Sequence, residues 1–445
     1  MSSPSAADPT TTDPTPLLHQ PHPSPPPHSD SPELAASLRR LESFLGLFGF
    51  CQYTPLSTAL SWLAFLSVGV LVPFLIIELY YCSHDTASSC DKYQVKGFEV
   101  EILVSEALLG AVSLGCVSHN LRKYGVRRFL FVDRFHGGVV QFRDEYVKII
   151  DNFFWLLATW VLPCFILKAA REVVRVIYVH NNPWWETVLT FFAILVSWSY
   201  SSIIYLSGSI LFSLLCNLQV IHFENYGKLL ERDLDVSVYI EEHMRLTHYL
   251  SKISHRFRIF LILEFLIVTA SQIVALLETT GNHSIINFIN GADFAVSSIV
   301  QVVGLVICLQ AATKITTRAQ GLASVASRWH ALVTCSSNDT SQLGTLDNVG
   351  NSEVADGAVP ITVNYLDSDQ ESGDYDVPGP TTIQLASYMS SYHKRQAFVM
   401  YVQSNLGGVT IFGWVIDRAL LNTVFFVEMS LASFVLGKTI SFTTK

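Results

Sequence analysis

The sequence predicts an all-α, polytopic membrane protein with seven transmembrane helices. Of its 445 residues, 50% are apolar and only 15% are charged, whereas a soluble domain normally carries about 25% charged residues. Seven apolar segments are each long enough for the roughly 20 residues that a bilayer core requires. None of them alternates apolar and polar residues with a period of two, which excludes a transmembrane β-barrel.

The seven segments follow one another along the chain after a polar N-terminal arm. The predicted spans are residues 58–80, 99–118, 152–174, 187–215, 259–278, 292–313 and 419–441. Membrane lipid is therefore the first partner that the sequence predicts. The net charge of −9 argues against binding to nucleic acid, because that binding depends on Lys and Arg.

Residues 1–34 form an arm rich in Pro, Ser and Thr with no apolar face to bury, so we expect it to be disordered and cytoplasmic. It lacks the basic start and apolar run of a signal peptide. Asp13, Leu17 and Leu18 have the spacing of an acidic dileucine sorting signal, although chance in a biased segment gives the same pattern. A working signal predicts vacuolar or endosomal membranes, and otherwise the plasma membrane is expected.

The rest of the chain divides into three parts. Residues 35–332 are expected to form a six-helix transmembrane bundle with cytoplasmic extensions, because apolar positions at helical spacing continue beyond the spans. Residues 333–382 are rich in Ser, Asp, Gly and Asn and predict a disordered cytoplasmic loop. Residues 383–445 hold an amphipathic cytoplasmic helix and the last span, so the final helix is split near Gly407 and Gly408, which are natural helix stops.

Lys and Arg are distributed unevenly between alternate connections. Roughly three-quarters of them fall on the set of connections that includes the N-terminal arm, and cytoplasmic loops carry such an excess. This predicts a cytoplasmic N-terminus and an outer C-terminus. On the outer side, Asn282 begins a glycosylation sequon, and Cys82 and Cys90 are either a disulfide or two unrelated thiols.

Catalysis has no candidate centre in the sequence. No HExxH, Walker A or GxSxG motif occurs, and the His residues lie outside the apolar spans or at their ends. An intramembrane zinc site needs converging His or carboxylate ligands. We therefore expect no enzymatic activity, no metal and no cofactor.

Carboxyl groups inside the spans are the main polar signal. Glu428 lies in the middle of the last span and Glu264 within the fifth, where a charge costs about 2.5–3.5 kcal/mol on insertion scales. Each either belongs to an ion pathway or is a protonated carboxyl bonded to a neighbouring helix. Further acids at the predicted outer helix ends either gather cations at a pore mouth or are simply solvated: Glu78, Glu101, Glu106, Glu278 and Asp293.

Four aromatic residues lie deeper in the spans than the usual interfacial belt. They are Trp160, Trp198, Tyr200 and Tyr205. Aromatic side chains with a few polar groups form pockets for small organic ligands. Ordinary helix packing is the alternative role for each ring.

The architecture resembles a known family. Seven helices with the N-terminus inside, a long loop before the last helix and a split final helix are similar to the insect gustatory and odorant receptor superfamily. The Pro-rich arm, Leu56–Tyr81, the basic connection Arg122–Arg143 and the stretch Gly407–Lys438 more closely resemble its plant relatives, the gustatory-receptor-like proteins.

This resemblance implies a homotetrameric, ligand-gated cation channel whose subunits each contribute the last helix to one central pore. The implied pore residues are Asn422, Phe425, Glu428 and Leu436, and a ligand pocket is implied toward the outer face. Two other classes remain open. One is a secondary transporter with Glu428 or Glu264 as its proton-coupled acid, and the other is a non-conducting receptor or scaffold that binds partners through the long loop.

Overall fold

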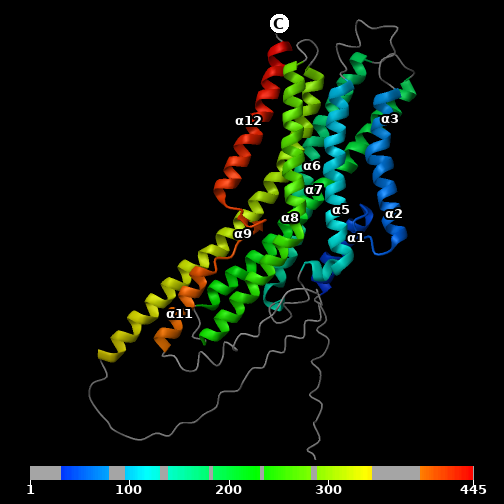
Figure 1. Cartoon of the computed structure of the whole chain (residues 1–445). Helices are drawn as coiled ribbons and strands as arrows, with labels where there is room; N and C mark the ends of the chain where they lie inside the picture. The colour runs from blue at the N-terminus through cyan, green and yellow to red at the C-terminus, as the bar shows by residue number, and fades with distance from the viewer. Residues whose placement is uncertain are drawn as a thin grey trace, which may run out of the picture.

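The structure is a computed structural model that describes residues 32–79, 96–130, 139–179, 184–230, 235–281, 288–342 and 391–443. Within these ranges the chain is almost entirely helical, and the helices run side by side in an elongated bundle (Figure 1). Seven of the described helices are long and apolar enough to cross a membrane, which confirms the seven predicted spans. Their length and composition make the protein an integral, multi-pass membrane protein.

The first span combines three consecutive helical pieces, and each of the other six lies in one long helix, of which α5 is kinked at Gly125. In chain order the elements are α1 (Pro32–Leu47), α2 (Pro55–Ala64), the π-helical segment η1 (Phe65–Leu71), α3 (Val72–Leu79), α5 (Lys96–Phe129), α6 (Val139–Val179), α7 (Trp184–Leu229), α8 (Val236–Gly281), α9 (Phe288–Gln342), α11 (Ser391–Ser404), β1 (Thr410–Ile411), β2 (Trp414–Val415) and α12 (Arg418–Thr443). In Figure 1, α1 lies at the lower end of the membrane bundle and the C-terminal end of α12 at the upper end.

The long helices extend well beyond the predicted spans. α7 has 46 residues and α9 has 55, which at 1.5 Å per residue gives roughly 70 and 80 Å, against about 30 Å for the hydrocarbon core. The lower parts of α8 and α9 continue past the other helices with α11 beside them (Figure 1). There the rings of Tyr239, Trp329 and Phe398 contact one another.

The end of α9 differs from the sequence-based expectation. Composition predicts a disordered loop over residues 333–382, whereas α9 continues to Gln342. Adding a turn to an existing helix costs much less than starting one, and Trp329 packs against α8 and α11 just upstream. Residues 343–382 lie outside the described residues, and α1 already begins within the last residues of the predicted arm, at Pro32.

α7 is the central helix of the bundle. It packs against α9, α6 and α5, and its side chains are buried almost without interruption from Ile204 to Phe223. Small side chains on α7 and on its neighbours allow the helices to approach closely. For example, Ser113 Oγ on α5 donates to the Ile204 carbonyl of α7 at 2.8 Å. Packing of small residues and interhelical hydrogen bonds hold helices together in lipid.

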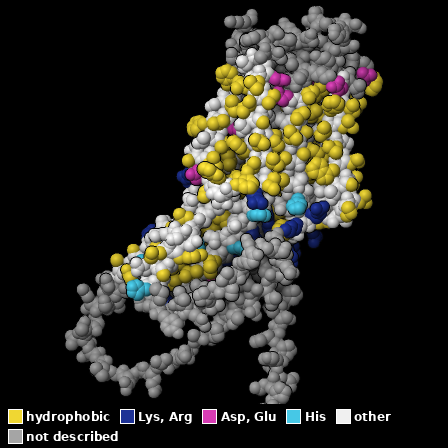
Figure 2. All heavy atoms as spheres, viewed as in Figure 1, with side chains coloured by type: hydrophobic (Ala, Val, Ile, Leu, Met, Phe, Trp, Pro, Cys, Tyr) yellow, Lys and Arg dark blue, Asp and Glu magenta, His cyan; other side chains and the backbone are white. Residues whose placement is uncertain are grey.

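The outer surface carries a broad apolar region (Figure 2). Large apolar side chains are exposed there, including Leu63 and Trp155 at 66% and 68%. On the face shown, Asp and Glu gather along the upper edge of this region, whereas Lys, Arg and His gather along its lower edge. So large an exposed apolar surface indicates contact with lipid or with another protein chain.

α12 lies at the edge of the bundle and is packed along one side only (Figure 1). It contacts α8 and α9, and its buried side chains recur at helical spacing: Val424, Glu428, Ala432 and Val435. Other sides of the helix are open, with Phe426 66% exposed and Ser430 exposed. α12 therefore keeps most of its surface for lipid or for another chain.

A short hairpin of β1 and β2 precedes α12. Its two-residue turn is formed by Phe412 and Gly413, whose φ angles are 47° and 89°, and positive φ at both positions is what a type I′ turn requires. The hairpin is docked on the long helices, because Thr410 N donates to Ser254 Oγ of α8 at 3.2 Å. The chain between α11 and α12 is thereby attached to the bundle.

Candidate functional site

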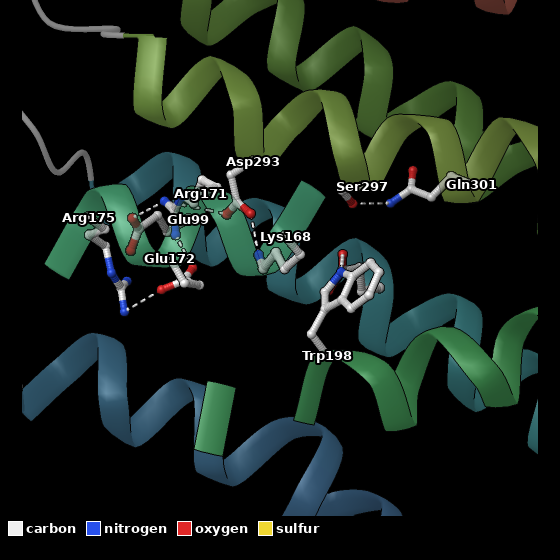
Figure 3. Close-up of polar contacts among 10 residues, drawn as sticks. Glu99, Lys168, Arg171, Glu172, Arg175, Trp198, Asp293, Ser297 and Gln301 are labelled. Carbon is white, nitrogen blue, oxygen red and sulfur yellow. Dashed lines mark hydrogen bonds and ion pairs between the residues drawn. The ribbon is translucent and has the colours of Figure 1, made fainter. Parts of the chain in front are cut away.

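Charged side chains meet inside the bundle toward its upper end in Figure 1, where they line what we call the ion-pair cavity (Figure 3). They come from α5, α6 and α9 and are buried or nearly so. The six residues are Glu99, Lys168, Arg171, Glu172, Arg175 and Asp293.

Arg171 is the centre of this cluster and contacts all three carboxyl groups. Its Nη2 atom lies 3.0 Å from Glu99 Oε1 and 3.7 Å from Asp293 Oδ2. Its Nη1 atom pairs with Glu172. One guanidinium therefore joins α5, α6 and α9, with the planar geometry that lets Arg bind several carboxyl oxygens at once.

The other two cations complete the cluster. Lys168 Nζ donates to Asp293 Oδ1, and Arg175 Nη2 lies 2.9 Å from Glu172 Oε2. Three cations and three carboxylates give these six residues no net charge. A buried charge without a partner is strongly unfavourable. Loss of any one of the six charges would therefore destabilise the residues that pair with it.

The sequence of α6 explains how one helix supplies four of the six residues. Positions 168, 171, 172 and 175 are spaced by three, one and three residues, so they lie on a single helix face. α5 and α9 each add one carboxyl group opposite that face. The cavity is therefore a meeting point of three helices that are far apart in the sequence.

The first span forms another wall of the ion-pair cavity through Gly69 and Pro73. Pro73 has no N–H to bond the Gly69 carbonyl, and the helix widens just before it into the π-helical turn η1. Ser197 Oγ of α7 donates to the Val68 carbonyl at 2.6 Å, which satisfies one backbone oxygen there. Single π-helical turns are frequent at functional sites.

The cavity itself is small. Its volume is about 60 Å³, which is enough for a few water molecules and well below the roughly 300–1,000 Å³ of pockets for drug-sized ligands. Trp198 and Glu106 also line it, and Trp198 Nε1 donates to Glu106 Oε1 at 3.1 Å. A larger ligand enters only if a side chain such as the indole of Trp198 moves.

A second polar group, which we call the Glu264 network, lies deeper in the bundle between α7, α8 and α9. Tyr205 Oη lies 2.9 Å from Glu264 Oε1 and 2.8 Å from the Gln301 carbonyl oxygen. Ser209 Oγ donates to the same Glu264 oxygen at 2.9 Å. The other oxygen, Glu264 Oε2, is buried without a hydrogen-bond partner among the described residues.

The side chain of Gln301 extends this network to α5. Its Nε2 atom donates to Ser105 Oγ at 2.8 Å and to Ser297 Oγ at 3.2 Å, and Ser271 Oγ donates to its Oε1 atom at 2.9 Å. Figure 3 shows Ser297 and Gln301 on one face of α9, beyond Asp293. Polar groups thus continue along α9 from the ion-pair cavity toward the Glu264 network.

The four residues implied as pore-lining differ in how deeply they are buried. Glu428 is buried against α8, where Thr269 Oγ1 donates to its Oε1 atom at 2.6 Å. Asn422 is exposed and Leu436 half-buried, and Phe425 is 39% exposed. Glu428 therefore attaches α12 to the bundle, whereas the other three lie nearer the open sides of the helix.

The four deep aromatic residues do not surround one pocket. Trp198 lines the ion-pair cavity, Tyr205 belongs to the Glu264 network, and the Tyr200 ring stacks on Phe48 with 6.2 Å between ring centroids. Trp160 lines a separate groove beside α12. Their expected common role as a ligand pocket therefore has no counterpart in the geometry.

Six of the predicted site residues lie outside the described residues. They are the glycosylation candidate Asn282, the disulfide candidates Cys82 and Cys90, and the sorting-signal residues Asp13, Leu17 and Leu18. Each of these assignments stays a prediction.

Sequence reasoning missed the pairing of the α6 charges. In the distribution of Lys and Arg between the spans, Lys168, Arg171 and Arg175 belong to the minority on the predicted outer side. Asp293 stands out only as an acid at a helix end. The available signal was the alternation of sign on one helix face, with Glu172 between Arg171 and Arg175. Glu99 on α5 and Asp293 on α9 show no comparable pattern, because each is a single acid in its own span.

Seven apolar helices around buried polar groups define an integral, multi-pass membrane protein. No curated protein matches the chain. The family described as "Protein of unknown function (DUF3537)" matches residues 36–427, and the chain belongs to that family.

Proposed function

We propose that the protein is one subunit of a homotetrameric, ligand-gated cation channel, similar in kind to the plant gustatory-receptor-like proteins. Its N-terminus faces the cytoplasm and its C-terminus the outer side, as the distribution of Lys and Arg favours. The observation that carries the proposal is the one-sided packing of α12. A membrane helix attached to the bundle edge by one face is available to line a shared central pathway.

The residues on the open side of α12 refine which positions line that pathway. Thr423, Phe426 and Ser430 are exposed and follow one another at spacings of three and four residues, so they share a helix face. Glu428 lies on the packed face. In this proposal the hydroxyl groups and Phe426 face the ions, and Glu428 holds the helix in position.

The ion-pair cavity is the ligand site in this proposal. Its charges are paired with one another, so a ligand with its own carboxylate or cationic group can replace one partner in a pair. Asp293 is on α9, which also packs against α12. When a ligand replaces one of the ion-pair partners of Asp293, the change acts on α9, and α9 contacts the helix that lines the pathway.

Modification of Ser430→Cys tests the open face of α12 in a Cys335→Ser background. Particle mass in lipid nanodiscs should correspond to four chains, and vesicles containing the protein should take up thallium ions. A positively charged methanethiosulfonate reagent should lower that uptake at least about twofold for Ser430→Cys, because the added group narrows and charges the pathway.

Leu189→Cys on α7 is the matched control, since Leu189 is 64% exposed on the apolar surface. Uptake by this variant should not respond to the reagent. A single chain per particle, or equal responses of the two variants, would contradict the proposed channel.

The Glu264 network favours a second candidate, a proton-coupled transporter. A carboxyl group in the middle of a membrane bundle marks a proton or ion pathway by default, and Glu264 keeps one buried oxygen without a partner among the described residues. Tyr205 and Ser209 can donate to the other oxygen in both protonation states. This arrangement suits a group that gains and loses a proton during a transport cycle.

Glu264→Gln separates this candidate from the channel. In vesicles with an internal pH dye, a transporter should move protons when amino acids or sugars are added outside, and Glu264→Gln should abolish that movement because an amide does not titrate. Glu145→Gln, at an exposed position of α6, should leave it unchanged. Thallium uptake that needs no proton gradient, with no solute-driven proton movement, would exclude the transporter.

A further inference from the structure

Two hollows follow α9 beside α12. The first, which we call the membrane groove, lies between α6, α9 and α12, has a volume of about 750 Å³ and is lined mainly by apolar side chains such as Val302, Val306, Phe425 and Met429. The second, the basic hollow, lies between α7, α9 and the start of α12 and has a volume of about 1000 Å³. Gln310 and Lys314 line both hollows, so the two hollows adjoin each other.

The basic hollow has a strong positive charge. Four cationic side chains line it, from Lys228, Lys314, Arg318 and Arg418, against one carboxylate, Glu224. Glu224 pairs with Arg318, with 3.2 Å between Oε1 and Nη2. The hollow therefore keeps a formal charge of +3 from its other three cations.

The groups next to these cations offset their charge only in part, because Asp417 is the one carboxylate among the described ones. Lys314 Nζ donates to the neutral amide oxygen of Asn217 at 2.8 Å. Asp417, the residue before Arg418, uses its Oδ1 atom to accept from Leu420 N at 2.8 Å, as the N-cap of α12. The cations at the start of α12 and on α9 are exposed and available to an anion.

Together the two hollows run from an apolar part of the bundle to a charged part, as a lipid molecule runs from its acyl chains to its head group. The membrane groove lies along the apolar parts of α6, α9 and α12, and the basic hollow lies where the apolar run of α9 gives way to Lys314 and Arg318. On the face in Figure 2, the lower edge of the apolar surface is where Lys and Arg gather. Basic pockets at the cytoplasmic ends of membrane helices suit anionic lipid head groups.

We propose that the two adjoining hollows bind a glycerophospholipid with an anionic head group. Its acyl chains occupy the membrane groove between α6, α9 and α12, and its phosphate lies among Lys228, Lys314 and Arg418. This site does not depend on ion conduction or on the ion-pair cavity. A second copy of the chain is the other possible occupant, but it would bring Lys and Arg of its own to the same depth.

Native mass spectrometry of the purified full-length protein tests the site with dioleoyl phosphatidic acid as the probe. The expected result is at least one phosphatidic acid bound per chain in preference to dioleoyl phosphatidylcholine. Lys314→Gln with Arg418→Gln should weaken binding of phosphatidic acid about tenfold or more, since each basic group near an anionic head group contributes to the affinity. Inorganic phosphate should not displace the lipid.

A matched double variant distinguishes this site from general attraction to a basic surface. Arg122→Gln with Arg128→Gln removes two exposed cations from the lower end of α5 and should leave the affinity unchanged. Equal weakening in both double variants, or displacement by inorganic phosphate alone, would overturn the proposal.

Met429→Phe tests the acyl-chain part of the site, because Met429 is 42% exposed in the membrane groove and a larger ring fills it without burying a new polar group. Lipid binding should fall while the thermal midpoint and the number of chains per particle stay the same. A change in chain number with unchanged lipid binding would assign the groove to a second copy instead.

Discussion

Asp293→Asn should lower the free energy of unfolding by about 3–5 kcal/mol, the usual cost of breaking a buried ion pair from one side. Asp293 accepts from Lys168 and lies 3.7 Å from Arg171. Without that charge, the buried Lys168 loses the carboxylate to which it donates its hydrogen bond. The measurement is an SDS titration of the purified protein in bicelles, followed by circular dichroism.

The matched control is the same substitution at a solvent-exposed pair. Asp151→Asn breaks the contact with Arg40, at 3.3 Å between side chains that are 51% and 64% exposed, and should cost less than about 1 kcal/mol. Equal losses in the two variants would mean that the ion-pair cavity is open to water.

Gly304→Ala should destabilise the protein by about 1–3 kcal/mol, the cost of overfilling a packed interior. A Cβ atom at this position would lie 2.3 Å from Tyr205 Oη and 2.5 Å from its Cζ. The Tyr205 ring is buried and bonded to Glu264, so it moves only by breaking that contact. The same SDS titration measures the loss, and the fluorescence of the protein reports whether the fold is kept.

Gly227→Ala on α7 serves as the control because a Cβ atom there meets nothing within 4 Å. Alanine in a helix is favoured over glycine by roughly 0.5–1 kcal/mol, so this variant should be as stable as the wild type or slightly more. Stabilisation by Gly304→Ala would show that α7 and α9 are separated more widely than in the structure.

Hydropathy was sufficient to predict seven spans, because a segment of about 20 apolar residues has few structures open to it other than a membrane helix. The helical spacing of apolar residues beyond the spans also predicted extensions into the cytoplasm, but not where each helix ends. α9 continues through Lys314 and Arg318 to Gln342, since a helix that leaves the membrane keeps its backbone hydrogen bonds in water. Hydropathy does not predict the widened turn η1 either, although Pro73 marks its position in the sequence.

The candidate site could be predicted only in part, for a physical reason. The depth of Glu264 and Glu428 follows from counting residues within a span, and both are buried. Their partners Tyr205 and Thr269 follow from which helix faces meet, and a single sequence does not contain that information. The ion-pair cavity shows the same limit, because Glu99 and Arg171 become neighbours only after α5 and α6 both pack against α7 and α9.

The attachment of the β1–β2 hairpin restricts how α12 can move. Thr410 N bonds to Ser254 of α8 and Val409 N bonds to Thr316 of α9 at 3.1 Å, immediately before the helix begins. A sliding motion of α12 along its axis would break both contacts, whereas a swing of its far end keeps them. The start of α12 is thus anchored, so a displacement of its far end would rotate the helix about the hairpin and would also break the contact between Glu428 and Thr269.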